Sequence, residues 1–95
     1  MGLRTITKCL GFQTTAVGTA TPVGLQVPTG LIRPTFAKIQ AEGAAMRYRD
    51  DGVDPTPTTG MFMQLNVPYD YDGDLTKIKF ISTSGGAIIN ALFYA

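Results

Sequence analysis

Glycine and proline recur along the whole chain at intervals too short for a long helix. The 95 residues include eleven glycines and six prolines, and turn sequences rich in Asp, Gly and Pro stand at residues 50–57 and 70–74. Glycine and proline destabilise helix interiors, while Asp, Gly and Pro favour turns. Most segments between these breaks are short and alternate apolar with polar side chains, which is the period of a β-strand. The sequence therefore predicts an all-β fold.

The expected strands are short and evenly spaced, which is typical of a β-sandwich or a small barrel. We predict one domain over residues 1–95, folded as a small antiparallel β-sandwich that is jelly-roll-like or immunoglobulin-like. The expected strands cover residues 3–10, 34–42, 45–49, 61–67, 75–81 and 87–94, with residues 42–44 joining two antiparallel strands and Pro68 ending a third. The expected core comprises Ile39, Met46, Tyr48, Met63, Leu65, Ile78, Phe80, Ile89, Ala91 and Phe93.

The last expected strand, residues 87–94, carries no charge and looks mostly covered on both faces. At the edge of a sheet, such a strand would invite aggregation. We therefore expect it at the centre of a sheet or beneath a partner.

Residues 9–32 carry no charge but contain many glycines, prolines, threonines and apolar residues. Disordered segments usually have high net charge and few apolar residues, so this segment is expected to be ordered against something. We predict an extended uncharged N-terminal arm or a pair of short edge strands. The candidate interface residues in it are Phe12, Val17, Val23, Leu25 and Val27.

Cys9 is the only cysteine, so a disulfide within the chain is impossible. We expect it to be a small buried apolar residue of the first strand. A bond to another chain is the alternative.

The residue types needed for common catalytic and metal sites are missing. The chain has no histidine, so neither serine nor cysteine has its usual base, and imidazole metal sites are excluded. Two carboxylate clusters, at residues 50–54 and 70–74, lie in expected turns and not across a cleft. We expect no enzyme activity and no cofactor.

Asp70, Asp72 and Asp74 place oxygens at alternating positions, as a calcium-binding loop does. The loop pattern then requires Gly at its sixth position and Glu at its twelfth, where this chain has Leu75 and Ile81. A simple Asp-Gly turn is the preferred interpretation, with calcium as a weak alternative.

Arg47, Tyr48 and Arg49 stand together beside two aspartates. A solvated charge patch at a hairpin end is the simpler interpretation. The alternative is a docking site for a neighbouring subunit, since Arg and Tyr are typical interface anchors.

Charged residues make up only 16% of the chain, and the net charge is +1 with no basic stripe. Nucleic acid is therefore not an expected partner. No segment approaches the roughly 20 apolar residues that span a bilayer, and residues 1–15 lack a signal-peptide pattern, so we expect no membrane association and synthesis in the cytoplasm. A surface with so little charge suggests coverage by neighbours, and we expect a homo-oligomer, with a trimer as the first hypothesis.

Several short motifs resemble those of small virion proteins of tailed bacteriophages. They are Gln-Ala-Glu-Gly at 40–43, Arg-Tyr-Arg-Asp-Asp-Gly at 47–52, Gly-Met at 60–61, and Asp-Leu followed by Ile-Lys-Phe-Ile within 74–81. The resemblance covers residues 34–95 and implies a non-enzymatic structural protein, located in the virion and in the host cytoplasm during assembly.

Within that class, a capsid decoration or cement protein bound to the major capsid protein is the first expectation. A tail, neck or collar component, or an adaptor for a fibre or spike, is the alternative. A carbohydrate-binding adhesin would also suit a small β-sandwich, but the chain has no tryptophan for a sugar platform.

Overall fold

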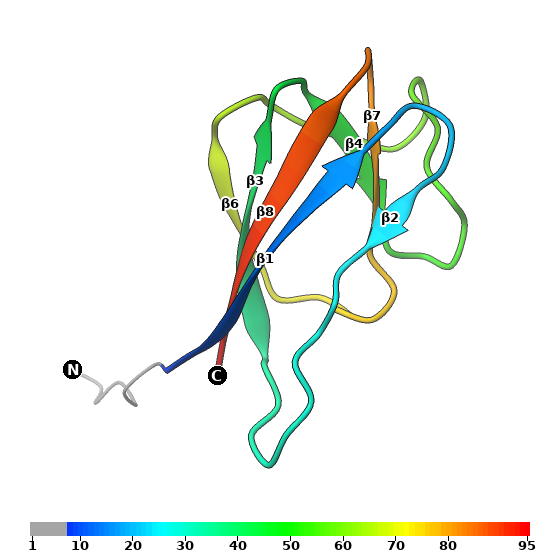
Figure 1. Ribbon diagram of the computed structural model, residues 1–95. Helices are drawn as coiled ribbons and strands as arrows, with labels where there is room; N and C mark the ends of the chain where they lie inside the picture. Colours follow the sequence, from blue (N-terminus) through cyan, green and yellow to red (C-terminus); the bar gives the residue numbers. More distant parts are fainter. Residues whose placement is uncertain (1–7) are drawn as a thin grey trace, which may run out of the picture.

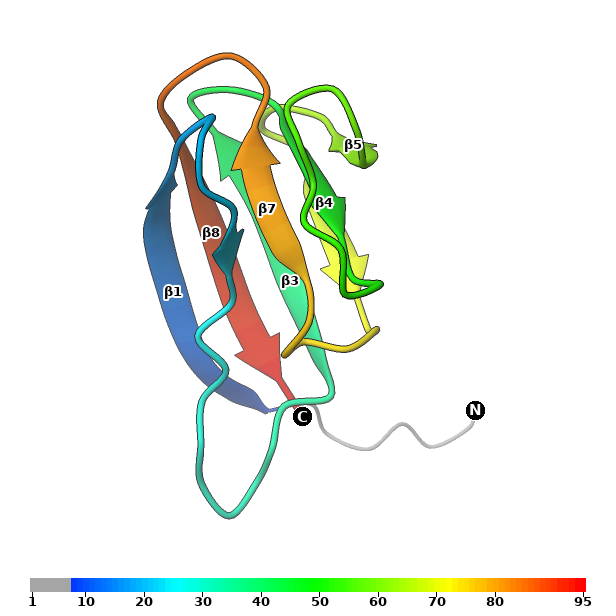
Figure 2. The same ribbon diagram turned by 90° about the vertical axis from the view of Figure 1, so that its right-hand side faces the viewer.

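The computed structural model describes residues 8–95, which form two four-stranded antiparallel sheets that face each other (Figures 1 and 2). The first sheet has the order β1 (Cys9–Val17), β8 (Ala87–Tyr94), β3 (Phe36–Glu42), β6 (Pro68–Tyr71). The second has the order β2 (Val23–Gly24), β7 (Lys79–Ser82), β4 (Met46–Arg49), β5 (Met61–Met63). The predicted all-β sandwich is confirmed. Across residues 8–95, no helix is long and apolar enough to cross a membrane.

The strand order is that of a jelly roll. Strand β1 pairs with β8, β2 with β7, β3 with β6 and β4 with β5, all antiparallel. These four pairs describe one long hairpin, with its turn between β4 and β5, that is wrapped into two sheets. The additional pairs β3·β8 and β4·β7 complete the sheets. Of the two predicted topologies, the fold is therefore the jelly roll.

Inward-facing side chains of the two sheets form one core. Eight of the ten expected core residues are almost completely buried, with Phe80 and Phe93 the largest. Tyr48 is only half-buried, and Leu65 is exposed. The error at Leu65 arises because the strand ends at Met63, and Asn66 then turns the chain with a φ of 63°.

Two strand boundaries differ from the prediction. Pro68 begins β6 and does not end a strand, which is possible because the first residue of an edge strand need not donate a ladder hydrogen bond. The strand expected from residue 75 begins only at Lys79. Its first residues turn instead, because the Asp74 carboxylate accepts hydrogen bonds from the amide and hydroxyl of Thr76.

Residues 42–44 carry the chain from one sheet to the other, whereas we expected them to join two paired strands. Gly43 has a φ of 86°, and a Cβ there would lie 3.1 Å from the Gly86 carbonyl oxygen. Only glycine fits this crossing without strain.

The uncharged segment is a pair of edge strands and the chain between them, and the extended-arm hypothesis is wrong for its first half. Strand β1 is hydrogen-bonded along β8, and Val17 is completely buried. The expected strand at residues 3–10 is shifted, since β1 starts at Cys9 and residues 3–7 lie outside the described residues. The expectation of a buried Cys9 is also wrong, because this residue is exposed.

Residues 23–27 close one side of the sandwich. Val23, Leu25 and Val27 pack against the core. The buried Gln13 of β1 ties them down, since its side chain donates to the Gly24 carbonyl and accepts from the Gln26 amide at 2.6 Å.

Strand β8 lies between β1 and β3, so its predicted central position is confirmed (Figure 2). Its inward residues are buried, but Ile88 on the opposite side is 39% exposed. The prediction that both faces of this strand are covered is therefore wrong for the chain alone.

Candidate interaction surface

The side of the β1-β8-β3-β6 sheet that faces away from the core is the main candidate surface. Directly opposed residues on neighbouring strands share a face. The register aligns Phe12 with Leu92 and Lys38, and Tyr94 with Phe36. This surface, here named the outer face, consists of Phe12, Thr14, Ala16, Phe36, Lys38, Gln40, Glu42, Ile88, Asn90, Leu92 and Tyr94.

The outer face carries an unusual number of apolar side chains for solvent-facing positions. Phe12 is 60% exposed, and Leu92 beside it is half-buried. Phe36 and Tyr94 stack in parallel, with ring centroids 5.1 Å apart and an interplanar angle of 14°. Together these residues form an apolar band across three strands.

The charged groups of the outer face have polar partners. The Lys38 amine lies 3.2 Å from the Asp70 carboxylate, and the Asn90 amide donates to Glu42 at 3.0 Å. Such exposed pairs contribute little to stability. The Lys38–Asp70 pair does neutralise charge, which lowers the cost of covering this part of the face with another molecule. The Glu42 carboxylate gains a hydrogen bond but keeps its charge.

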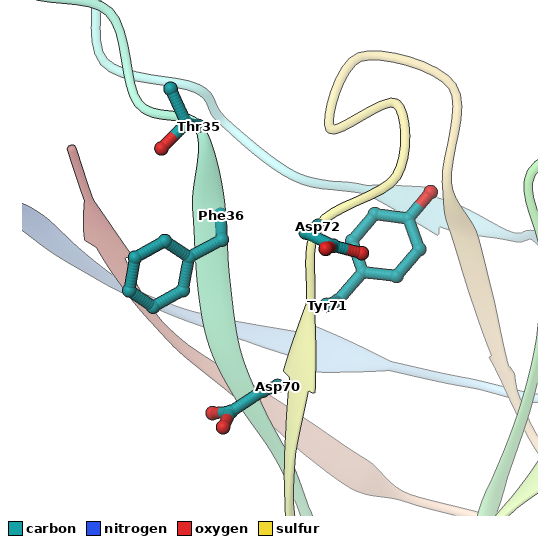
Figure 3. Close-up of a pocket in the computed structure, with 5 residues that line it drawn as sticks. All are labelled: Thr35, Phe36, Asp70, Tyr71 and Asp72. Carbon is teal, nitrogen blue, oxygen red and sulfur yellow. The ribbon is translucent and has the colours of Figure 1, made fainter. Parts of the chain in front are cut away.

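Two hollows mark this sheet. A small one of about 110 Å³ lies on the outer face between Phe12 and Pro68. A larger one of about 480 Å³, here named the end hollow, is lined by Thr35, Phe36, Asp70, Tyr71 and Asp72. Figure 3 shows Phe36 and Asp70 pointing to the same side of the sheet, while the Tyr71 ring turns to the other side.

The outward side of the opposite sheet is partly covered by the chain itself, while Phe62 on that side stays 53% exposed. Arg47 of β4 donates from Nε to the Pro57 carbonyl at 3.2 Å and from its terminal nitrogen to the Gly60 carbonyl at 3.0 Å. Its guanidinium also lies 5.6 Å from the centre of the Phe62 ring. These contacts hold residues 50–60 over the sheet, and Ile81 is buried on that side.

The predicted Arg-Tyr-Arg docking site is therefore not free. Arg47 binds its own loop, and Tyr48 packs at a centroid distance of 6.3 Å from Phe80. Arg49 pairs with Asp51, and this hydrogen-bonded guanidinium lowers the pKa of the Asp51 carboxyl to about 2. All three side chains act within the chain.

The structure places the other expected interface residues in different environments. Val17 belongs to the core, which contradicts its assignment as an interface residue. Val23, Leu25 and Val27 are half-buried against their own core. Only Phe12 lies on the outer face.

The calcium alternative is not supported by the geometry. Asp70 pairs with Lys38, and Asp74 binds Thr76. Within residues 8–95, no three carboxylate, imidazole or thiol side chains gather closely enough to hold an ion.

The residues that sequence reasoning missed are Phe36, Ile88, Leu92 and Tyr94. Their alternation was visible, but apolar residues on both faces of residues 87–94 were interpreted as double burial. Only the arrangement of residues 8–95, which places no layer over the outer face, reveals that they are accessible.

Comparison of the chain with models of known protein families, with curated proteins and with solved structures gives no significant match.

Proposed function

We propose that the protein is a non-enzymatic structural subunit of a bacteriophage virion, most simply a decoration or cement protein that attaches through its outer face. Its binding partner in this role is the major capsid protein or another virion protein.

The outer face is the main support for the proposal. An apolar band across three strands, beside the paired charges of Lys38 and Asp70, costs little to desolvate and gains from burial. Phe12, with most of its surface in water, is the most exposed apolar side chain of this face and its natural anchor. The low charged fraction of the whole chain agrees with a surface that is partly covered in use.

The jelly-roll topology and the motif resemblance add general support. Jelly rolls are common in viral capsid proteins, but also in lectins, so the topology alone is an analogy. The motifs that resemble phage virion proteins point to the same class.

Copy number separates a decoration protein from a tail, neck or collar component. In virions of the phage that encodes the chain, quantitative mass spectrometry should find on the order of hundreds of copies for a shell protein, against about a dozen for a ring at the neck or tail. Absence from purified particles would reject the proposal in both forms.

A matched pair of variants tests the role of the outer face. Phe12→Asp should prevent incorporation into particles, whereas Met61→Asp should not. Both residues lie in edge strands and have similar exposure, 60% and 63%, but Met61 belongs to the opposite sheet. Equal incorporation of both variants would show that another surface makes the contact.

A further inference from the structure

The loop between β2 and β3 extends beyond the ends of the strands, as Figures 1 and 2 show. The name loop tip is used here for Leu31, Ile32 and Arg33, three exposed residues of this loop at and beside its bend. Leu31 is fully exposed, and Ile32 is 53% exposed. A protruding tip with two large apolar side chains is poorly suited to water and well suited to insertion into a neighbour.

The charged residue of the loop tip, Arg33, forms no ion pair within the described part of the chain. Only two ion pairs form among residues 8–95, Lys38–Asp70 and Arg49–Asp51. Arg33 takes part in neither. Asp72, on the wall of the end hollow, likewise has no hydrogen bond or ion pair within this range.

The end hollow has the complementary chemistry. It is lined by the Phe36 ring and by the carboxylates of Asp70 and Asp72. Asp70 is already paired with Lys38, so Asp72 supplies the negative charge that is open to a partner. Leucine and isoleucine side chains can pack on the ring, and a guanidinium can bind carboxylates with two parallel hydrogen bonds. Its volume of about 480 Å³ leaves room for these side chains.

We propose that the loop tip of one copy of this chain docks in the end hollow of a second copy, with Arg33 paired to Asp72 across the contact. This deepens the proposed function, since it names one contact through which the subunit would assemble. The chain's own loop tip does not fill its own hollow, since none of its three residues belongs to the lining.

The loop tip and the end hollow lie at the same end of the molecule, where β3 begins and β6 ends. Two copies related by a twofold axis can therefore exchange tips, each filling the other's hollow, which makes the contact closed and self-complementary. The expected unit is a dimer, whereas the sequence suggested a trimer.

A charge exchange tests the contact. In sedimentation velocity, Arg33→Asp and Asp72→Arg should each weaken dimer formation at least about tenfold, since each places like charges together in both copies of the contact. Mixing the two variants should restore dimers. In the mixed dimer, one contact pairs the two introduced charges, and the other pairs the two native ones.

Two controls keep the result interpretable. Asp54→Arg makes the same charge change at an exposed carboxylate outside the hollow and should leave the dimer intact. The Leu31 side chain is fully exposed, so it does not pack against its own chain. Leu31→Ser should therefore weaken the dimer without unfolding the protein.

A wild-type monomer at all concentrations, or single variants that dimerise normally, would overturn the self-contact, as would a mixture that fails to recover. A monomer that still enters virions would leave the proposed function intact and assign the tip and hollow to another virion protein. Absence from virions together with normal dimers would reject the function and retain the contact.

Discussion

The Tyr71 hydroxyl donates a hydrogen bond to the Asp50 carboxylate and so joins the two sheets of the sandwich. Tyr71 ends β6 in the first sheet, and Asp50 directly follows β4 in the second. The same hydroxyl lies 3.3 Å from the Asp74 carbonyl oxygen. One phenol therefore links an edge strand to two loops, in addition to the contacts that Arg47 and Thr76 make with them.

Removing this hydroxyl should destabilise the fold without leaving a cavity. We expect Tyr71→Phe to lower the free energy of unfolding by about 1 to 2 kcal/mol, since a hydrogen bond to a charged acceptor is lost. Urea unfolding measures the difference. Tyr94→Phe is the control, because the Tyr94 hydroxyl has no hydrogen bond within residues 8–95, and it should change stability by less than about 0.5 kcal/mol.

Alkaline pH should weaken the same link. Burial, followed by the hydrogen bond to Asp50, raises the pKa of Tyr71 above its ordinary value of 10.0. A group whose pKa is raised by folding stabilises the native state below its unfolded pKa and loses that contribution as the pH rises. The free energy of unfolding should therefore fall above about pH 10, and it should fall less steeply in Tyr71→Phe. Parallel curves for the two proteins would contradict this assignment.

The core should be far more sensitive than the surface to loss of a phenyl ring. Phe80 is completely buried between the sheets, so Phe80→Ala should cost about 3 to 5 kcal/mol, out of a total of about 5 to 15 kcal/mol for a domain of this size. Phe62→Ala removes a 53% exposed ring that contacts Arg47 and should cost at most about 1 kcal/mol. Similar losses of unfolding free energy in the two variants would indicate that Phe80 does not lie in the core between the two sheets.

The sequence identified most of the core because a strand places alternate side chains on one face. Ile39, Ile89 and Phe93 follow that alternation and are buried as predicted. Alternation does not say which strands pair, however. The pairing of β1 with β8 joins residues near opposite ends of the chain, and no local pattern encodes a contact at that separation. The jelly-roll order therefore came only from the structure.

The candidate surface was harder to predict for a related reason. Arg47 looked available because charged side chains in strands usually face solvent, but the structure folds residues 50–60 back onto it. Leu92 looked buried because it is apolar, but nothing in the described part of the chain forms a layer over its side of the sheet. The polarity of a side chain predicts only its usual environment. The exposure of Arg47 and Leu92 depends instead on which segment of the chain lies over each sheet.

Arg47 should act as a clamp on its loop. Lysine keeps the charge but cannot donate to the Pro57 and Gly60 carbonyls in the same fork, so Arg47→Lys should loosen residues 50–60. Hydrogen exchange at these residues should become faster, with a stability loss of about 1 to 3 kcal/mol. Arg49→Lys is the comparison, since an exposed pair such as Arg49–Asp51 contributes little to stability. Unchanged exchange in Arg47→Lys would mean that the loop is held by its other contacts.

Cys9 offers a direct probe of the outer face. It is exposed at the start of β1 and lies opposite Tyr94, which stacks on Phe36. We expect iodoacetamide to modify this thiol completely in the native free protein, since no unfolding is needed to reach it. In purified virions the same thiol should react more slowly, because a partner bound to the outer face would cover the edge strand β1 that carries Cys9. Slow modification of the free protein would show that Cys9 is shielded by its own chain, and equally fast modification in virions would place the contact on another surface.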